Sequence, residues 1–330
     1  MDRFRRTTAA ARRSLWVPVS VALALVLGAC AGGAAPAATD PGGNAVLRVA
    51  QSTPAEWVQP VLAAQTGAFD RANLTVNMNE FASGRDALQA LSGGAVDIAM
   101  ATPSNVAPAV MGGEDLVVFG VVARWGSWRL VARGDRGVTN PASLVGKKIG
   151  VPTGTSADQS FGLLLKSNGI SRDQVTIVNV APPDMIPVLS NGSVDAVSIW
   201  QPNLSVLEAA VPGTVSIPYD MPSSFLFVTT REFADSNAEV LRRFLDANSA
   251  VDGMLTGDQG QALDLMTGPA RIERPLLATV WKDFDFRTTG PDAQTLGELA
   301  DAAQFVIDNG SQPGPAPDFS GHVRQVGGGA

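Results

Sequence analysis

An internal repeat constrains the fold of this chain more than any other feature of its sequence. The segment ALSGGAVDIA at residues 90–99 returns as VLSNGSVDAV at residues 188–197. Short β-branched runs stand at matching positions around the two copies, at residues 47–50, 74–76, 148–151 and 175–178. Because a repeated supersecondary unit builds the same local structure each time, the sequence predicts two similar lobes.

Helical segments are expected between these strands. Each has a helical period of apolar residues and ends near a glycine that can adopt the left-handed conformation, at residues 57–66, 85–92, 157–168 and 184–190. Alternating strands and helices build parallel sheets that helices cover on both faces. The predicted fold class is therefore α/β, with a mostly parallel sheet flanked by helices in each lobe.

Longer β-rich runs follow each copy of the repeat. Apolar runs at residues 116–123 and 128–132 follow the first copy, and residues 225–228 follow the second. Ser236 and Glu239 form a predicted capping box that opens a helix, beyond which there is no third copy. We therefore expect the chain to cross from lobe 1 into lobe 2, return, and complete lobe 1 with its C-terminal helices. The expected boundaries are residues 45–128 and 225–310 for lobe 1, 129–224 for lobe 2, and 311–330 for a loosely ordered tail.

The first thirty residues are typical of an export signal. Five arginines precede an apolar run at residues 15–29, which is followed by Cys30. A basic start, an apolar stretch too short to span about 30 Å of hydrocarbon, and small residues before a cleavage point mark a secretory signal. We expect residues 1–29 to be a lipoprotein signal peptide and residues 30–44, rich in Ala, Gly and Pro, to be a flexible tether.

The sequence Leu-Gly-Ala-Cys that ends at Cys30 resembles a bacterial lipobox, in which the cysteine is acylated and becomes the new N-terminus. The protein is then expected to be exported and lipid-anchored to the outer face of the cell membrane, or periplasmic. A buried free cysteine behind an ordinary signal is the alternative. Arg12 and Arg13 weakly resemble a twin-arginine signal, so the export route stays open.

Composition excludes several kinds of site and partner. One Cys excludes an internal disulfide, and one His beside one Cys excludes a zinc cluster of Cys and His ligands. No other metal site and no cofactor is expected. The formal charge is -7, and it becomes about -11 without residues 1–29, which carry five Arg and one Asp. A surface this acidic argues against nucleic acid as a partner.

Several short motifs together resemble those of one transport family. They lie at residues 65–69, 94–99, 146–155, 192–196 and 200–202. With them the chain resembles the substrate-binding lipoproteins of ABC importers, in the nitrate, sulfonate, taurine and thiamine-precursor binding family, over most of residues 45–255. The resemblance implies a type II periplasmic-binding-protein clamshell, two lobes joined by two crossover strands. It also implies a monomer that holds a small molecule between its lobes and delivers it to a permease and ATPase.

The candidate ligand residues follow strand ends and precede helices. In open α/β sheets, ligands bind beyond the carboxyl ends of the strands, where helix N-termini favour an anionic group. The polar candidates are Ser52, Thr53, Ser83, Thr102 and Ser104 in lobe 1, and Thr153, Gly154, Thr155 and Ser156 in lobe 2. Capping of their own helices is the alternative for each hydroxyl. Gly154 favours a ligand at the last group, because glycine lets the backbone approach closely.

Tryptophans and one arginine are further candidates. Trp57 and Trp200 fall just past strand ends, and Trp125 lies at the expected hinge, so each could stack on a ligand, with core packing as the alternative. Arg124 could pair with an anion through its planar fork, or be an exposed arginine. Gln201 follows Trp200 where many relatives carry Glu, and its neutral amide argues against a ligand amine at that position.

Enzymes of the same fold are the main rival. Relatives that form the thiamine pyrimidine use an active-site His and a Lys-bound cofactor. Here the one His, His322, lies in a Gly- and Pro-rich tail, and Lys147 and Lys148 precede a strand at the end away from the cleft. We therefore expect a binding protein rather than an enzyme. A non-transport sensor and a binder of a thiamine or flavin precursor, or another aromatic, stay open.

Asp97 and Asp195 occupy equivalent positions in the two copies of the repeat. Each follows a helix and a glycine-containing turn and begins a strand. We expect them at strand entrances, away from the cleft, where they bond turns and backbone rather than act as a catalytic pair.

Overall fold

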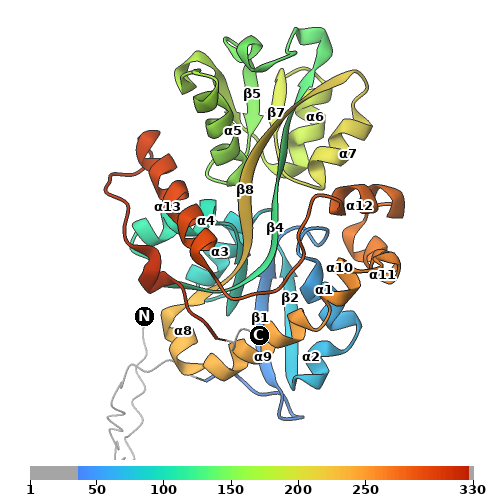
Figure 1. Ribbon diagram of the computed structural model, residues 1–330, viewed down its shortest axis with the longest axis vertical. Coiled ribbons are helices and arrows are strands. Elements are labelled where there is room, and N and C mark those ends of the chain that lie inside the picture. The colour runs from blue at the N-terminus through green and yellow to red at the C-terminus, as the bar shows by residue number, and fades with distance from the viewer. Residues whose placement is uncertain (1–35, 327–330) are drawn as a thin grey trace, which may run out of the picture. The chain divides into compact units, whose positions relative to one another are not determined.

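The computed structural model describes residues 36–326, and its strands join in one sheet (Figure 1). The strands are β1 (Ala45–Gln51), β2 (Leu74–Glu80), β3 (Ile98–Ala101), β4 (Leu116–Arg133), β5 (Lys148–Val151), β6 (Thr176–Asn179), β7 (Ala196–Ser198) and β8 (Thr214–Thr230). Within the described residues the sheet has eight strands in the order β2-β1-β3-β8-β4-β7-β5-β6. We call the part built on β2-β1-β3 lobe 1 and the part built on β7-β5-β6 lobe 2.

Strand direction separates the lobes from the strands that connect them. β1 is parallel to β2 and β3, and β5 is parallel to β6 and β7. β4 and β8 pair antiparallel from Leu116–Thr230 to Arg133–Thr214 and run through both lobes. The expected crossover pair is therefore present. The runs predicted at 116–123 and 128–132 are one strand, because the residues between them keep pairing with β8 through register shifts.

Helices cover both faces of the sheet (Figure 1). One face carries α3 (Gly84–Ser92), α4 (Pro103–Met111), α5 (Ser156–Ser167) and α13 (Ala293–Asp308). The other carries α1 (Val58–Gln65), α2 (Ala68–Arg71), α6 (Met185–Ser190), α7 (Asn203–Ala210), α9 (Ala238–Ser249), α10 (Gly253–Thr256), α11 (Gly260–Ala270) and α12 (Arg274–Trp281), with α8 (Arg231–Ser236) at the end of β8. The four helices expected within the repeats, α1, α3, α5 and α6, begin and end within one residue of the prediction.

The predicted capping box is wrong. Ser236 ends α8, and Asn237 is the residue that precedes α9. The Asn237 side chain bonds the Ala37 N–H and the Phe233 carbonyl instead of capping α9. In the part of the chain that the structure describes, no helix is long and apolar enough to span a bilayer.

The two strand-entrance aspartates have the same role in both lobes. Asp97 Oδ2 accepts the Arg48 N–H at 2.8 Å, and Asp195 Oδ2 accepts the Lys148 N–H at 2.9 Å. In each case the aspartate's own N–H donates back to the carbonyl of that same residue. The structural role expected for this pair is confirmed.

The tail expected to be loosely ordered instead packs on lobe 1 as far as residue 326. Phe319 is 3% exposed, His322 Nδ1 lies 2.9 Å from the Leu116 carbonyl oxygen, and the Arg324 N–H donates to the Val118 carbonyl at 2.9 Å. The expectation is therefore corrected for residues 311–326. The reason is long-range, because these bonds are made to β4, about 200 residues earlier in the chain.

Candidate functional site

A small cavity lies where the two lobes meet. Seven of the predicted residues line it: Ser52, Trp57, Thr102, Trp125, Thr155, Ser156 and Trp200. Its other lining residues are Glu56, Gly84, Asn105, Trp128, Ser223 and Phe225. The volume open to the centre of a water molecule is about 20 Å³. Since one water needs about 10–15 Å³ by that measure, the cavity is small in this structure. A ligand can enter only when the lobes open, and the lining side chains must move to make room for it when the lobes close again.

Direct contacts hold the lobes closed. The Arg85 guanidinium donates to the Thr153 carbonyl at 2.9 Å, and Ser104 Oγ donates to Gln159 Oε1 at 2.5 Å. Asn105 Nδ2 donates to the carbonyl of Gly154 at 3.3 Å. Ser104, Thr153 and Gly154, predicted as ligand contacts, therefore join one lobe to the other.

Gly154 lets another group come close to the backbone, as expected, but in this structure that group is a protein side chain and not a ligand. Its φ is 74°, in the left-handed region, and an added Cβ would lie 2.8 Å from Arg85 Nη1. The closely approaching group in this structure is the guanidinium of lobe 1.

The helix N-termini at the cavity differ in how their hydroxyls are used. Ser83 Oγ accepts the Asp86 N–H at 3.2 Å, so it caps α3 and lies outside the lining. Thr155, which precedes α5, makes no capping bond, and its Oγ1 donates to the Pro152 carbonyl. The N–H groups in the first turn of a helix have no intrahelical partner, so the start of α5 at Thr155 and Ser156 can receive an anionic group.

Aromatic rings form much of the cavity wall. The Trp57 ring meets Phe225 edge-on at 5.0 Å between centroids, and its Nε1 donates to Ser52 Oγ at 2.8 Å. The Trp125 and Trp128 rings lie 4.7 Å apart, and Trp128 Nε1 donates to the backbone. Strand alternation would send residues 125 and 128 to opposite faces, but a register shift between Trp125 and Ser127 lets both line the cavity.

Glu56 is the charged lining residue that sequence reasoning missed, besides Ser223 and Phe225. It lies in the turn between β1 and α1 and is 2% exposed. Its Oε1 has no hydrogen-bond donor among the described residues, and burial raises the pKa of its carboxyl well above the ordinary value. The available signal was an acidic residue directly before a tryptophan, in the loop that follows a strand end.

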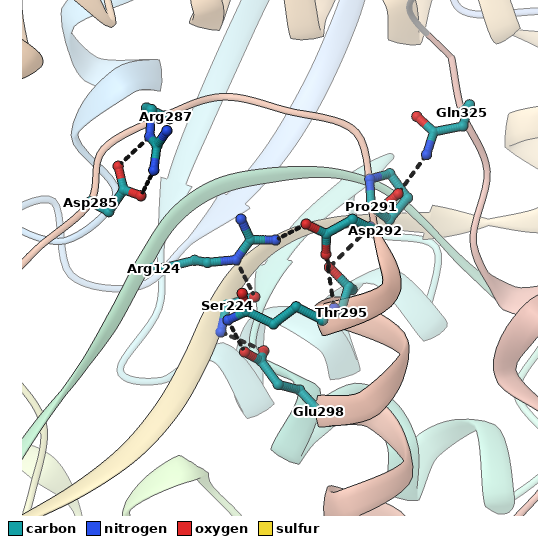
Figure 2. Close-up of polar contacts among 10 residues, drawn as sticks. Arg124, Ser224, Asp285, Arg287, Pro291, Asp292, Thr295, Glu298 and Gln325 are labelled. Atoms are coloured by element: carbon teal, nitrogen blue, oxygen red, sulfur yellow. Dashed lines mark hydrogen bonds and ion pairs between the residues drawn. The ribbon is translucent and has the colours of Figure 1, made fainter. Parts of the chain in front are cut away.

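Seven of the predicted site residues lie outside the cavity lining: Ser83, Ser104, Thr153 and Gly154, described above, and Thr53, Arg124 and Gln201. The Arg124 guanidinium donates to Ser224 Oγ at 3.2 Å and pairs with Asp292 at 2.8 Å, at the residue that caps α13 (Figure 2). Thr53 accepts backbone bonds through its carbonyl, and the buried Gln201 accepts a backbone N–H through Oε1. The prediction of an anion contact at Arg124 is corrected, because its neighbour Trp125 takes the cavity side of β4.

Comparisons with known proteins show which family the chain resembles. A family model described as NMT1/THI5 like matches residues 56–254. The taurine-binding periplasmic protein of Escherichia coli (strain K12) is 28% identical over 302 residues, which cover 84% of this chain and 91% of that protein.

Solved structures show the same fold. The alkanesulfonate-binding protein SsuA from Xanthomonas axonopodis pv. citri, bound to MOPS, superposes with a TM-score of 0.74 at 19% identity and covers 88% of this chain and 100% of its own. The desulfurization enzyme DSZB superposes with a TM-score of 0.63 at 16% identity, covering 84% and 95%. The fold class predicted from the sequence, the two-lobed α/β fold of periplasmic binding proteins, is confirmed. Since the family model spans more than half of the sequence, the chain belongs to the NMT1/THI5-like family.

Proposed function

We propose that this protein is the solute-binding component of an ABC importer, which captures a small organic anion and delivers it to a permease and its ATPase. One observation carries the proposal: a cavity lined by both lobes, with the start of α5 on one side and the starts of α3 and α4 on the other. The similarity to a taurine-binding periplasmic protein supports it.

Capture would work by closure. The proposed moving parts are residues 45–128 with 225–310 as lobe 1 and residues 129–224 as lobe 2, bending about β4 and β8. A ligand that bridges the lobes favours the closed state by its extra affinity for that state. The interlobe bonds of Arg85, Ser104 and Asn105 then add to that preference. No covalent bond is made or broken.

The proposed ligand contacts fall into two groups. Ser156 Oγ and the first-turn N–H groups at the starts of α4 and α5 would surround the acidic group, since the hydroxyls of Thr155 and Thr102 already donate to the Pro152 carbonyl and to Asn105 Oδ1. Trp57, Trp125 and Trp200 would cover the rest of the ligand. The same rings favour the second candidate, a binder of an aromatic such as a thiamine or flavin precursor.

A thermal-shift panel of taurine, alkanesulfonates, nitrate, carboxylates and aromatic precursors tests the ligand class. A sulfonate or carboxylate is expected to raise the melting temperature, because binding to the native state stabilises it by about 2.7 kcal/mol at a hundredfold excess over Kd. The ligand recovered from the complex should be unchanged by mass spectrometry, unlike the product of an enzyme such as DSZB. Stabilisation by neutral or cationic aromatics alone would contradict the anion class and favour the second candidate.

Export and anchoring rest on residues outside those the structure describes. We propose that cleavage leaves Cys30 as a lipid-modified N-terminus, which would hold the protein near its permease at the outer face of the membrane. Mass spectrometry of protein purified from its native host should find an N-terminal peptide that begins at an acylated Cys30, and Cys30→Ala should lack it. An unmodified cysteine in a mature, membrane-free protein would contradict the anchor but leave solute binding untouched.

A further inference from the structure

The cavity contains two buried polar atoms with opposite requirements. Glu56 Oε1 is an acceptor without a donor, and Trp125 Nε1 is a donor without an acceptor, among the residues that the structure describes. Both side chains line the cavity and are at most 3% exposed. Buried polar groups are almost always satisfied, so this pair indicates a ligand that supplies both an N–H donor and an oxygen acceptor.

No other described lining residue carries a charge that could pair with Glu56. The walls come from the β1–α1 turn, α3, α4, β4, α5, the β7–α7 turn and β8, and among the described lining residues Glu56 is the one ionisable side chain. Burial is the cause of its raised pKa, with no compensating partner. A carboxylate in such a site is stable only when a cation enters with the ligand.

The rings around Glu56 suit a cation as well. Trp57, Trp125, Trp128 and Trp200 line the same cavity. The faces of tryptophan rings attract ammonium groups, most strongly where water is excluded. A carboxylate among indole rings is thus a recognition site for a cationic nitrogen, while the helix starts at Thr155 and Thr102 favour an anion.

We propose that Glu56 pairs with a cationic nitrogen of the ligand, so that this cavity selects zwitterions, alkylamines that also carry a sulfonate or carboxylate, over simple organic anions. This inference rests on the proposed function, since it places the ligand in the same cavity. It differs from the sequence expectation, in which the neutral Gln201 argued against a bound amine.

Proton release should accompany capture. Because burial holds the Glu56 pKa above its ordinary value of 4.5, the ligand-free closed site keeps the carboxyl protonated below that raised pKa. Pairing with an ammonium requires the carboxylate, so binding expels one proton. Affinity for a zwitterion should therefore rise with pH, by up to tenfold per pH unit below the raised pKa, and level off above it.

Matched ligands on the wild-type protein give the first test. Taurine and isethionate differ by an ammonium in place of a hydroxyl, and β-alanine and 3-hydroxypropionate give the same pair as carboxylates. Titration calorimetry in buffers of different ionisation enthalpy counts the protons exchanged. An amine ligand should bind at least about tenfold more tightly than its hydroxyl partner. Binding of the amine ligand should also release up to one proton from the protein, whereas binding of its hydroxyl partner should release none.

Variants supply the second test. Glu56→Gln should remove both the preference for the amine and the proton release, and should change the affinity for the hydroxyl ligands little. Glu232→Gln, on the exposed start of α8, is the matched control and should behave as wild type. Without ligand, the melting temperature of E56Q minus that of the wild type should increase as the pH is raised from about 5 to about 8. The reason is that the raised folded-state pKa weakens the wild type as pH passes through it.

The outcomes separate this inference from the proposed function. Equal affinity for amine and hydroxyl ligands, or amine binding without proton release, would overturn the role of Glu56 and leave anion capture standing. Failure of every sulfonate and carboxylate to bind would overturn both. Because proton counting uses the wild-type protein, poor folding of E56Q would not remove the test.

Discussion

Replacing Gly162 by tryptophan is expected to hold the lobes apart and weaken ligand binding. Gly162 lies on α5 of lobe 2, and an added Cβ would overlap the ring of Phe305 on α13 of lobe 1. The same contact carries the Lys166–Asp308 ion pair at 3.0 Å and the Arg172 guanidinium at 5.9 Å from the Phe305 ring centre. Overpacking costs about 1–3 kcal/mol. If this cost falls on the closed state alone, ligand affinity decreases by roughly 5- to 150-fold.

Small-angle scattering, with and without the best ligand of the thermal-shift panel, distinguishes closure from simple misfolding. The wild type should become more compact on saturation, and Gly162→Trp should keep the larger radius of gyration. Ser167→Trp adds the same ring at an exposed position on the same helix, so it should close normally. Wild-type affinity and compaction in Gly162→Trp would contradict the proposed lobe movement.

Replacing Phe244 by alanine is expected to lower the free energy of unfolding by about 3–5 kcal/mol, the usual loss for a buried phenylalanine. Phe244 on α9 is fully buried, stacked on Phe69 at 5.5 Å and edge-on to Phe227 at 5.0 Å between ring centres. It thus packs α9 against α2 and β8 of lobe 1. Urea denaturation measures the loss.

Phe244→Leu keeps most of the buried volume and should lose clearly less stability than Phe244→Ala. Neither variant touches the cavity, so ligand affinity under folding conditions should stay near the wild-type value. A loss below about 1 kcal/mol in Phe244→Ala would show that α9 does not dock on lobe 1 as described.

The parts of the fold that local sequence determines were predictable. Helix period, glycine stops and β-branched runs located α1, α3, α5 and α6 to within a residue. The repeat itself predicted the shared role of Asp97 and Asp195. These features depend on neighbours in sequence, so one chain without relatives suffices to find them.

Features set by strand register were not predictable. Trp125 and Trp128 share the cavity because of the register shift between Trp125 and Ser127, which no residue period in the sequence predicts. Arg124 leaves the cavity because its neighbour Trp125 takes that side of β4. The helix starts were identified as a region, but which hydroxyl faces the cavity depends on packing, as Ser83 and Ser156 show. Glu56 was missed because a buried, unpartnered carboxylate is improbable until its surroundings are known.

The segments that lie along β4 in lobe 1 also affect how copies of the protein meet. Residues Asp285 and Thr289 exchange backbone bonds with Arg124 and Val121, and Arg324 donates to Val118. An open strand edge is a template on which another chain can add a strand and start aggregation. By occupying this edge with its own C-terminal chain, the protein removes one place where another copy could add a strand, which leaves β2 and β6 as the outer strands of the sheet.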